Sequence, residues 1–241
     1  MSKTMSAYQA AISGHAQALA YNAKLYASVL DDIQLDFAGK TVLDVACGHS
    51  NPFFTERMRT ARHIIGLDCN AAELARNTLI QEAVHGDVHA MPVPDASVDV
   101  IVSCNTVEHC DDPGAFIREC SRVLKPGGTA VFTTPNLWGY KTLIAKFCGK
   151  YLFNWIWLKF HGRTWDEYDS LYRANTANAV RRVARQAGLN VREIRYVPEV
   201  THFFYCHPIL FAAGDLYNRV TGAVGMCWLW SYFAFVLVRP K

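Results

Sequence analysis

The sequence predicts an α/β fold in which a doubly wound, mostly parallel sheet carries helices on both of its faces. Three observations predict it. Short apolar runs rich in β-branched residues recur along the chain, helical patterns separate them, and 241 residues suffice for one core of this kind. Right-handed crossovers would bring the carboxyl ends of the parallel strands to one edge, where ligands bind at the topological switch point.

Each expected element follows from its own periodicity. Apolar runs predict strands over 41–47 (TVLDVAC), 63–68 (HIIGLD), 98–104 (VDVIVSC), 128–135 (GTAVFTTP) and 191–197 (VREIRYV). Apolar residues at helical spacing predict one or two helices within 6–30, and one each over 55–62, 71–83, 112–124 and 175–187. The segment 85–94, which precedes a proline, offers one further short strand.

Composition excludes several classes of function. The net charge is only +3, and no basic run is present, so we expect no nucleic-acid partner. The eight cysteines form no CxxC pair and no Cys/His cluster with zinc spacing, so we expect no metal. The N-terminus lacks a charged region followed by an apolar one, and a reducing, cytoplasmic setting is therefore expected.

The segment VLDVACGHS (42–50) predicts a ligand-binding loop. A strand ends near an acidic residue, Asp44, and then turns through the small residues Ala46 and Gly48. Small residues allow a close approach to a ligand and a positive φ. A dinucleotide-binding GxGxxG loop is disfavoured, because its third glycine would fall at Asn51.

Two further segments continue the pattern. Asp68 ends the second predicted strand, 24 residues after Asp44, where a carboxylate suits a ribose diol; alternatively, it caps the following helix. In RECSRVLKPGG (118–128), Lys125 is expected in the last helical turn, and Pro126 and the glycines after it are expected to end the helix.

With HGDVHAMPVPDASVDVIVSCNTVEHCDDP (85–113), these segments resemble, in order and spacing, the class I S-adenosylmethionine-dependent methyltransferases over about residues 40–190. The resemblance implies a Rossmann-like sheet of seven strands with an antiparallel last strand. It implies S-adenosylmethionine as methyl donor, S-adenosylhomocysteine as product, and no metal. The family loop has three glycines, whereas this chain has Ala46 and Ser50 at the first and third positions.

The resemblance also assigns roles to residues. Asp44 would help to hold the methionine ammonium group, Asp68 the ribose hydroxyls and Asp87 the adenine amino group. The Val88 backbone would face the adenine ring, and Cys104 with Asn105 would flank the transferring methyl. The implied cofactor-binding residues are Asp44, Ala46, Cys47, Gly48, Asp68, Cys69, Asp87, Val88, Cys104 and Asn105.

Methyl transfer is an in-line displacement, so alignment of the reactants supplies most of the catalysis. A general base is needed only where the nucleophile carries a proton that must leave. The candidates are His109 and His161, with His49 a weaker one; His109 alternatively packs or caps a helix. Tyr172 and Arg173 offer contacts to an anionic acceptor, or lie on a plain surface.

Four regions are expected along the chain: a helical cap (1–36), the cofactor-binding core (37–136), a substrate-binding insertion or lid (137–176) and the C-terminal part of the sheet (177–241). The stretch 137–160 combines four lysines and no acidic residue with apolar residues at helical spacing. It predicts either a lid or a helix in a membrane interface.

The stretch 220–238 has nineteen residues without a charge, which suits either a membrane span or the buried last strand. Peripheral membrane contact is therefore expected through 137–160 or 203–238, if anywhere.

The expected function is methyl transfer to a small-molecule acceptor, with O-methylation of a sugar or lipid-linked intermediate as the first hypothesis. Two alternatives stay open: a membrane-associated quinone- or lipid-type C-methyltransferase, and a non-catalytic S-adenosylmethionine-binding module. The sequence leaves the oligomeric state open.

Overall fold

A computed structural model describes residues 22–51, 53–140, 142–143, 146–147, 170–199 and 208–241. The chain divides into two compact units. The first contains Met1–Asp32, Pro135–Asp169 and Tyr196–Phe233, and the second contains Ile33–Thr134, Ser170–Arg195 and Ala234–Lys241. The boundaries expected at 36, 136 and 176 stay predictions.

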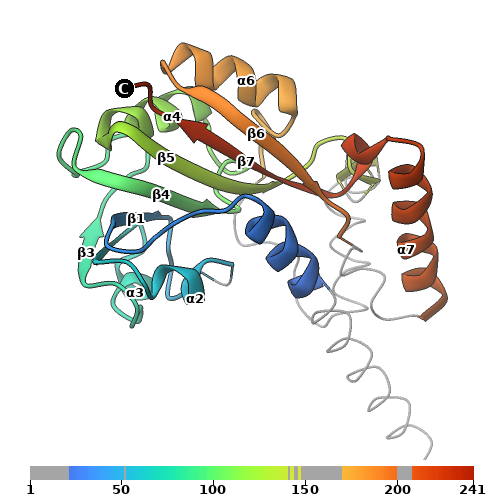
Figure 1. Cartoon of the computed structure of the whole chain (residues 1–241), viewed down its shortest axis with the longest axis horizontal. Coiled ribbons are helices and arrows are strands. Elements are labelled where there is room, and N and C mark those ends of the chain that lie inside the picture. The colour runs from blue at the N-terminus through green and yellow to red at the C-terminus, as the bar shows by residue number, and fades with distance from the viewer. Residues whose placement is uncertain (1–21, 52, 141, 144–145, 148–169, 200–207) are drawn as a thin grey trace, which may run out of the picture. The chain divides into compact units, whose positions relative to one another are not determined.

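Seven strands form one sheet in the order β3-β2-β1-β4-β5-β7-β6 (Figure 1). Their bounds are β1 Thr41–Val45, β2 His63–Asp68, β3 Glu82–His85, β4 Val98–Cys104, β5 Leu124–Pro135, β6 Asn190–Val197 and β7 Tyr232–Val238. The seven-stranded doubly wound fold is thus confirmed. The chain runs outward from β1 to β3 and then returns to β4 on the other side of β1, so the switch point lies between β1 and β4.

Most of the sheet is parallel. β1 pairs in parallel with β2 and with β4, β2 with β3, and β4 with β5. β7 reverses the direction: Gly127 and Gly128 exchange backbone hydrogen bonds with Arg239, whereas Asn136, at the other end of β5, bonds to Ser231. The expected antiparallel last strand is therefore present, and most of it is buried.

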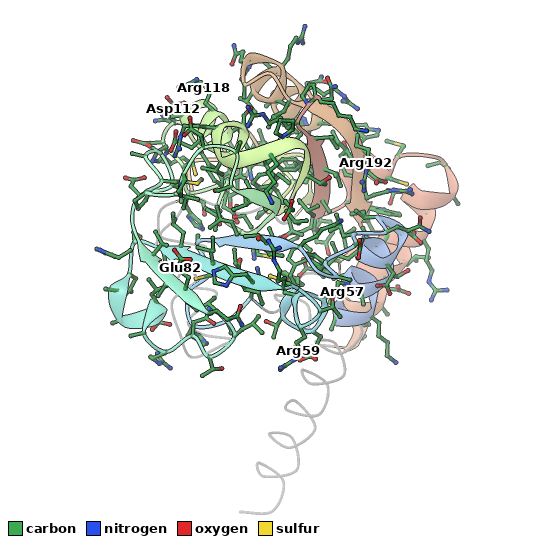
Figure 2. All side chains as sticks on the ribbon, turned by 60° about the vertical axis from the view of Figure 1, so that its left-hand side comes forward. Arg57, Arg59, Glu82, Asp112, Arg118 and Arg192 are labelled. Carbon is green, nitrogen blue, oxygen red and sulfur yellow. The ribbon has the colours of Figure 1, made fainter. Side chains whose placement is uncertain are left out.

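The helices that surround this sheet are α2 Thr55–Met58, α3 Ala71–Leu74, α4 Pro113–Val123 and α6 Ala177–Gln186. Right-handed crossovers place α2 and α3 on one face and α4 on the other, where α6 packs against α4. Asp112 caps α4, and Thr176 caps α6. Asp112 also forms an ion pair with Arg118 (Figure 2).

The helix predicted over 71–83 is wrong beyond Leu74, and β3 occupies its end. Asn77 provides the physical reason. Its Oδ1 accepts a hydrogen bond from the Leu79 N–H, and its Nδ2 donates to the Gly48 carbonyl. Such local bonds compete with helix continuation. The further short strand was expected in 85–94, but β3 shares only His85 with that segment.

Two other boundaries are corrected. The helix expected over 55–62 is the single turn α2. α4 ends at Val123, so Lys125 lies in β5 and not in a last helical turn. The LKPGG segment is instead a strand irregularity, since the register between β4 and β5 shifts there. A Cβ on Gly128 would lie 2.8 Å from the Lys125 carbonyl oxygen, and this close approach requires glycine.

Aromatic rings fill the core beside β5. Phe132 stacks on Phe235 of β7 with ring centroids 4.8 Å apart and meets Phe116 of α4 edge-on at 5.7 Å. All three are buried, and β1 and β4 add Val42, Leu43, Val45, Val100, Ile101 and Val102. The core therefore holds β1, β4 and β5 rigidly, which fixes the loops at their carboxyl ends.

The first unit contains a helical segment over 22–32 and α7, Pro208–Ala223. In it, Asn136 Nδ2 donates to the carbonyls of Trp228 and Trp230. Gly139 is required there, because a Cβ would lie 2.7 Å from Ser231 Cα. The uncharged stretch 220–238 divides among the end of α7, a 3-10 turn (Cys227–Leu229) and β7. Within the described residues, no helix is long and apolar enough to cross a membrane.

Candidate active site

The loop after β1 places a carboxylate at the switch point. Asp44 lies next to the end of β1 and is 1% exposed. Burial raises the pKa of its carboxyl to about 7, a hydrogen bond from Asn51 lowers it, and the nearby Asp68 raises it further. The chain then turns through two left-handed residues, Ala46 at φ 56° and Gly48 at φ 49°. A positive φ at Ala46 is strained, and this is the position where the resembling family has its first glycine.

Asn51 organises the same corner, and the sequence reasoning treated it only as the residue that breaks a dinucleotide fingerprint. Its Nδ2 donates to Asp44 Oδ1 at 2.8 Å. Its Oδ1 accepts from the Cys104 thiol at 3.1 Å and from the Phe54 N–H at 3.3 Å. Asn51 thus joins the loop after β1 to the end of β4. In the sequence it is only a small polar residue after the loop, and no pattern there indicates this link.

Asp68 connects the loops after β1 and β2. Its Oδ2 accepts a hydrogen bond from the Gly48 N–H at 2.8 Å, and its Oδ1 accepts one from the Asn70 N–H at 2.8 Å. Asn70, not Asp68, caps α3, because its Oδ1 accepts from the N–H groups of Ala72 and Glu73. The capping alternative for Asp68 is therefore wrong. Each Asp68 oxygen keeps a second lone pair for a ligand hydroxyl.

The remaining predicted residues after β2 and β3 differ in exposure. Cys69 is exposed and Val88 is partly exposed, while Cys47 is buried and its N–H donates to the Leu67 carbonyl of β2. Asp87 is exposed, and its Oδ1 accepts from both the backbone N–H (2.8 Å) and the ring Nδ1 (2.7 Å) of His89. These two bonds hold the pKa of Asp87 below its usual range.

The turn after β4 contains a buried carboxylate, Glu108, that was not predicted as a site residue. Asn105 has a left-handed backbone (φ 52°), and its N–H donates to the Thr133 carbonyl. Glu108 is 3% exposed and accepts a hydrogen bond from the Thr134 hydroxyl at 2.9 Å. Asn175 Nδ2 donates to the same hydroxyl at 2.7 Å. The buried Glu108 carboxylate thus lies in the turn after β4, close in sequence to Cys104 and Asn105, which were predicted to flank the transferring methyl.

The candidate general bases differ in their position and exposure. His109 lies in that turn and is partly exposed, and its N–H donates to the Thr106 carbonyl. His161 lies outside the described residues. His49 is exposed and pairs with Glu73 at 2.6 Å. Arg173 donates to the Asp111 carbonyl, which gives it a structural contact rather than a demonstrated ligand role.

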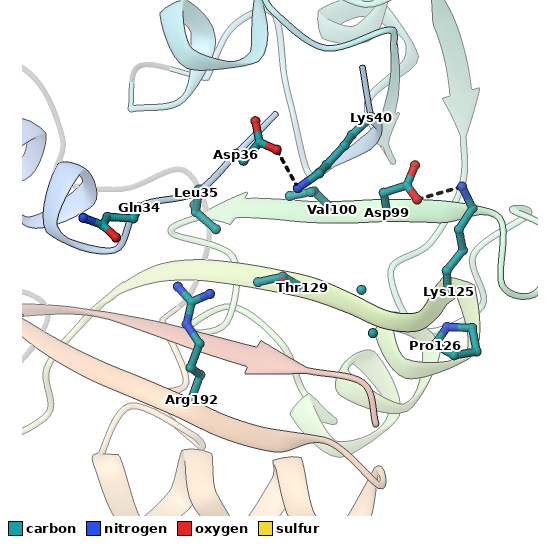
Figure 3. Close-up of a pocket in the computed structure, with 12 residues that line it drawn as sticks. Gln34, Leu35, Asp36, Lys40, Asp99, Val100, Lys125, Pro126, Thr129 and Arg192 are labelled. Atoms are coloured by element: carbon teal, nitrogen blue, oxygen red, sulfur yellow. Dashed lines mark hydrogen bonds and ion pairs between the residues drawn. The ribbon is translucent and has the colours of Figure 1, made fainter. Parts of the chain in front are cut away.

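A pocket of about 280 Å³ lies at the opposite edge of the second unit, at the amino ends of β4, β5 and β6 (Figure 3). Its charged side chains are mostly paired with each other: Lys40 with Asp36 at 3.2 Å, and Lys125 with Asp99 at 2.8 Å. Arg192 also lines it and donates to the Ile33 carbonyl. The pocket is therefore separate from the residues described above.

Comparison with known proteins decides the family. A methyltransferase domain model matches residues 43–132. A ubiquinone biosynthesis O-methyltransferase of Pseudomonas fluorescens is 30% identical over 185 residues, which cover 71% of this chain and 75% of that protein. This chain belongs to the class I S-adenosylmethionine-dependent methyltransferases. It is a methyltransferase enzyme of this family.

Two other methyltransferases extend the comparison. A probable S-adenosylmethionine-dependent methyltransferase of Mycolicibacterium smegmatis is 40% identical over 103 residues, and this match spans 41% of the present chain but only 39% of that relative. A geranyl diphosphate C-methyltransferase of Streptomyces coelicolor has the same fold, with a TM-score of 0.57 at 15% identity over 89% of this chain and 76% of that one. At this identity the likeness concerns the fold alone.

The residues at the carboxyl edge fit the methyl donor of this family. Asp44 is a buried carboxylate whose pKa is raised, so a cationic ammonium group would stabilise its charged form. Space is open at Gly48, since a Cβ there would meet nothing within 4 Å. Among the described residues, no group of three or more His, Cys, Asp or Glu side chains is arranged to hold a metal ion.

Proposed function

We propose that this methyltransferase methylates an oxygen of a small-molecule acceptor, and that the acceptor is an apolar or lipid-linked alcohol or phenol. The observation that carries the proposal is the similarity to ubiquinone biosynthesis O-methyltransferases over 71% of the chain. These proteins are named for O-methylation within the biosynthesis of a lipid-soluble compound. Composition agrees, because 51% of the residues here are hydrophobic and 19% are charged.

In this proposal the donor site consists of the residues assigned from the sequence. Asp44 balances the ammonium group, Asp68 accepts from the ribose hydroxyls while it holds the Gly48 N–H, and Asp87 accepts from the adenine amino group. When bound, S-adenosylmethionine supplies an electrophilic methyl. The turn that contains Glu108 and His109 lies at the end of β4, and one of these side chains would take the acceptor proton.

A transfer assay with ¹³C-methyl-labelled S-adenosylmethionine tests this proposal. Candidate acceptors are catechols with and without prenyl tails, and free sugars. We expect a labelled methoxy carbon on the prenylated catechol, which NMR distinguishes from a methyl on carbon. A C-methyl product would overturn the proposal in favour of the C-methyltransferase alternative. Saturable binding of S-adenosylhomocysteine without transfer to any acceptor would favour the non-catalytic module.

We also propose peripheral contact of α7 with a lipid surface. Ile209, Leu216, Val220 and Val224 are 72%, 61%, 53% and 63% exposed. Spacings of seven and four residues place the first three on one side of α7, and Val224 directly follows the last residue of the helix. The interleaved charges are paired, because Arg219 Nε lies 2.7 Å from Asp215 Oδ2. Trp228 in the following turn is also 45% exposed, and an aromatic side chain suits the interface of a bilayer.

Flotation with phosphatidylglycerol-containing vesicles tests this contact. We expect the full chain to float with the vesicles and the double variant Leu216→Ser/Val220→Ser to stay in the soluble fraction. The matched control, Val191→Ser on the outer strand β6, should float as the original protein does. If the double variant floats equally well, the α7 contact is refuted.

A further inference from the structure

The His89 ring lies between the loop after β3 and the segment that follows β4, at the carboxyl edge of the sheet. Its Nδ1 lies 2.7 Å from Asp87 Oδ1, in the loop after β3. Its Nε2 lies 3.2 Å from Asp111 Oδ1, beyond the turn that follows β4, but forms no hydrogen bond with a described residue. The His89 side chain is 26% exposed, whereas the two carboxylates are 70% and 74% exposed. The partly buried ring therefore holds the solvated Asp87 carboxylate by a hydrogen bond, whereas Asp111 is only a neighbouring charge.

The two hydrogen bonds from His89 to Asp87 determine which Asp87 oxygen is left for a ligand. Both hydrogen bonds from His89, one from its backbone and one from its ring, end on Oδ1. Two bonds to the same oxygen fix the rotation of the carboxyl group, and Oδ2 remains to accept a further donor. An exposed aspartate without such restraint would lose side-chain entropy on binding a ligand.

We propose that His89 is a positioning residue for adenine recognition: it orients the Asp87 carboxylate so that Oδ2 accepts the exocyclic amino group. The inference rests on the proposed role of Asp87, to which it adds the group that acts on it. His89 itself contacts neither the donor nor the acceptor in this proposal.

Calorimetric titration with two probes isolates this role. S-adenosylhomocysteine carries the 6-amino group, and S-inosylhomocysteine has an oxygen in its place. We expect His89→Ala to weaken S-adenosylhomocysteine binding by about five- to tenfold, which corresponds to the loss of about one hydrogen bond. Binding of S-inosylhomocysteine should change less than about twofold, since that probe presents a carbonyl oxygen and no amino group at position 6. His89→Gln, which keeps a side-chain N–H donor, should restore part of the lost affinity.

Two variants make the outcomes distinguishable. Asp87→Asn should abolish the preference for the amino probe; an unchanged preference would refute the placement of Asp87 and with it this inference. If Asp87→Asn behaves as expected but His89→Ala weakens both probes equally, His89 only stabilises the loop, and the positioning role is refuted. His63→Ala is the matched control: it removes a His–Glu pair of 3.0 Å far along β2 from the site and should leave both affinities unchanged.

Discussion

The carboxylates at the two edges of the sheet differ in burial and in their partners. At the amino edge, Asp36 and Asp99 each face a lysine, and these side chains are partly or largely exposed. At the carboxyl edge, Asp44 and Asp68 are buried, and their described contacts are an amide and backbone N–H groups. Neither of them forms an ion pair with another described residue.

The difference separates structural charge from functional charge. A partly exposed ion pair contributes little to the free energy of unfolding, because water solvates both partners. A buried carboxylate without a cation costs free energy, which the raised pKa of Asp44 reflects. Such a group is typical of a site that a ligand completes, which agrees with the donor site proposed at the switch point between β1 and β4.

The largest effect is expected at Asp68. Asp68→Ala removes the carboxylate proposed to bind ribose and frees the Gly48 N–H. S-adenosylhomocysteine should then bind at least about tenfold more weakly, since hydrogen bonds to charged groups contribute about 1.5–3 kcal/mol. Calorimetry at pH 8 measures it. Asp99→Ala at the amino edge is the control and should leave the affinity unchanged. Equal losses in both variants would contradict the division between the edges.

The second effect is a pH dependence of binding. The pKa of Asp44 is about 7 without ligand, and a bound ammonium group favours the charged carboxylate. Binding therefore releases a proton below pH 7, and S-adenosylhomocysteine affinity should fall about tenfold from pH 8 to pH 6. Asp44→Asn should flatten this profile while it lowers the affinity. A profile of the same slope in Asp44→Asn would assign the titration to another group.

The smallest effects concern thermal stability without ligand. The folded-state pKa of Asp44 lies above its unfolded value of 3.8, so its contribution to stability is present at low pH and lost as pH rises through about 7. At pH 8, Asp44→Asn should raise Tm by about 3 °C or more. Lys125→Met, which breaks a half-exposed pair, should lower Tm by about 2 °C or less. A destabilised Asp44→Asn protein would contradict the comparison.

The fold was predictable from the sequence because strand and helix periods alternate cleanly, and β2, β4 and α4 match their predicted ranges to within two residues. The helix predicted over 71–83 was wrong beyond Leu74, because apolar spacing gives no information on the hydrogen bonds of the Asn77 side chain, which compete with the helix. Motif order predicted Asp44, Asp68 and Asp87, whose roles stay predictions. Asn51 and Glu108 were missed because their partners, Cys104 and Thr134, are distant in sequence, and His89 was missed because its bonds to Asp87 depend on the local turn.

The Asn51 amide has one more consequence. Because a single side chain bonds both Asp44 and the Cys104 thiol, the two sides of the switch point share one hydrogen-bond circuit. Protonation of Asp44 would weaken the hydrogen bond that its carboxylate accepts from Asn51 Nδ2. Because Oδ1 of the same amide accepts from the Cys104 thiol, a shift of Asn51 would also affect the end of β4. If the ammonium group of the donor binds beside Asp44, as proposed, its binding would therefore be energetically coupled to the strand end that precedes Glu108 and His109.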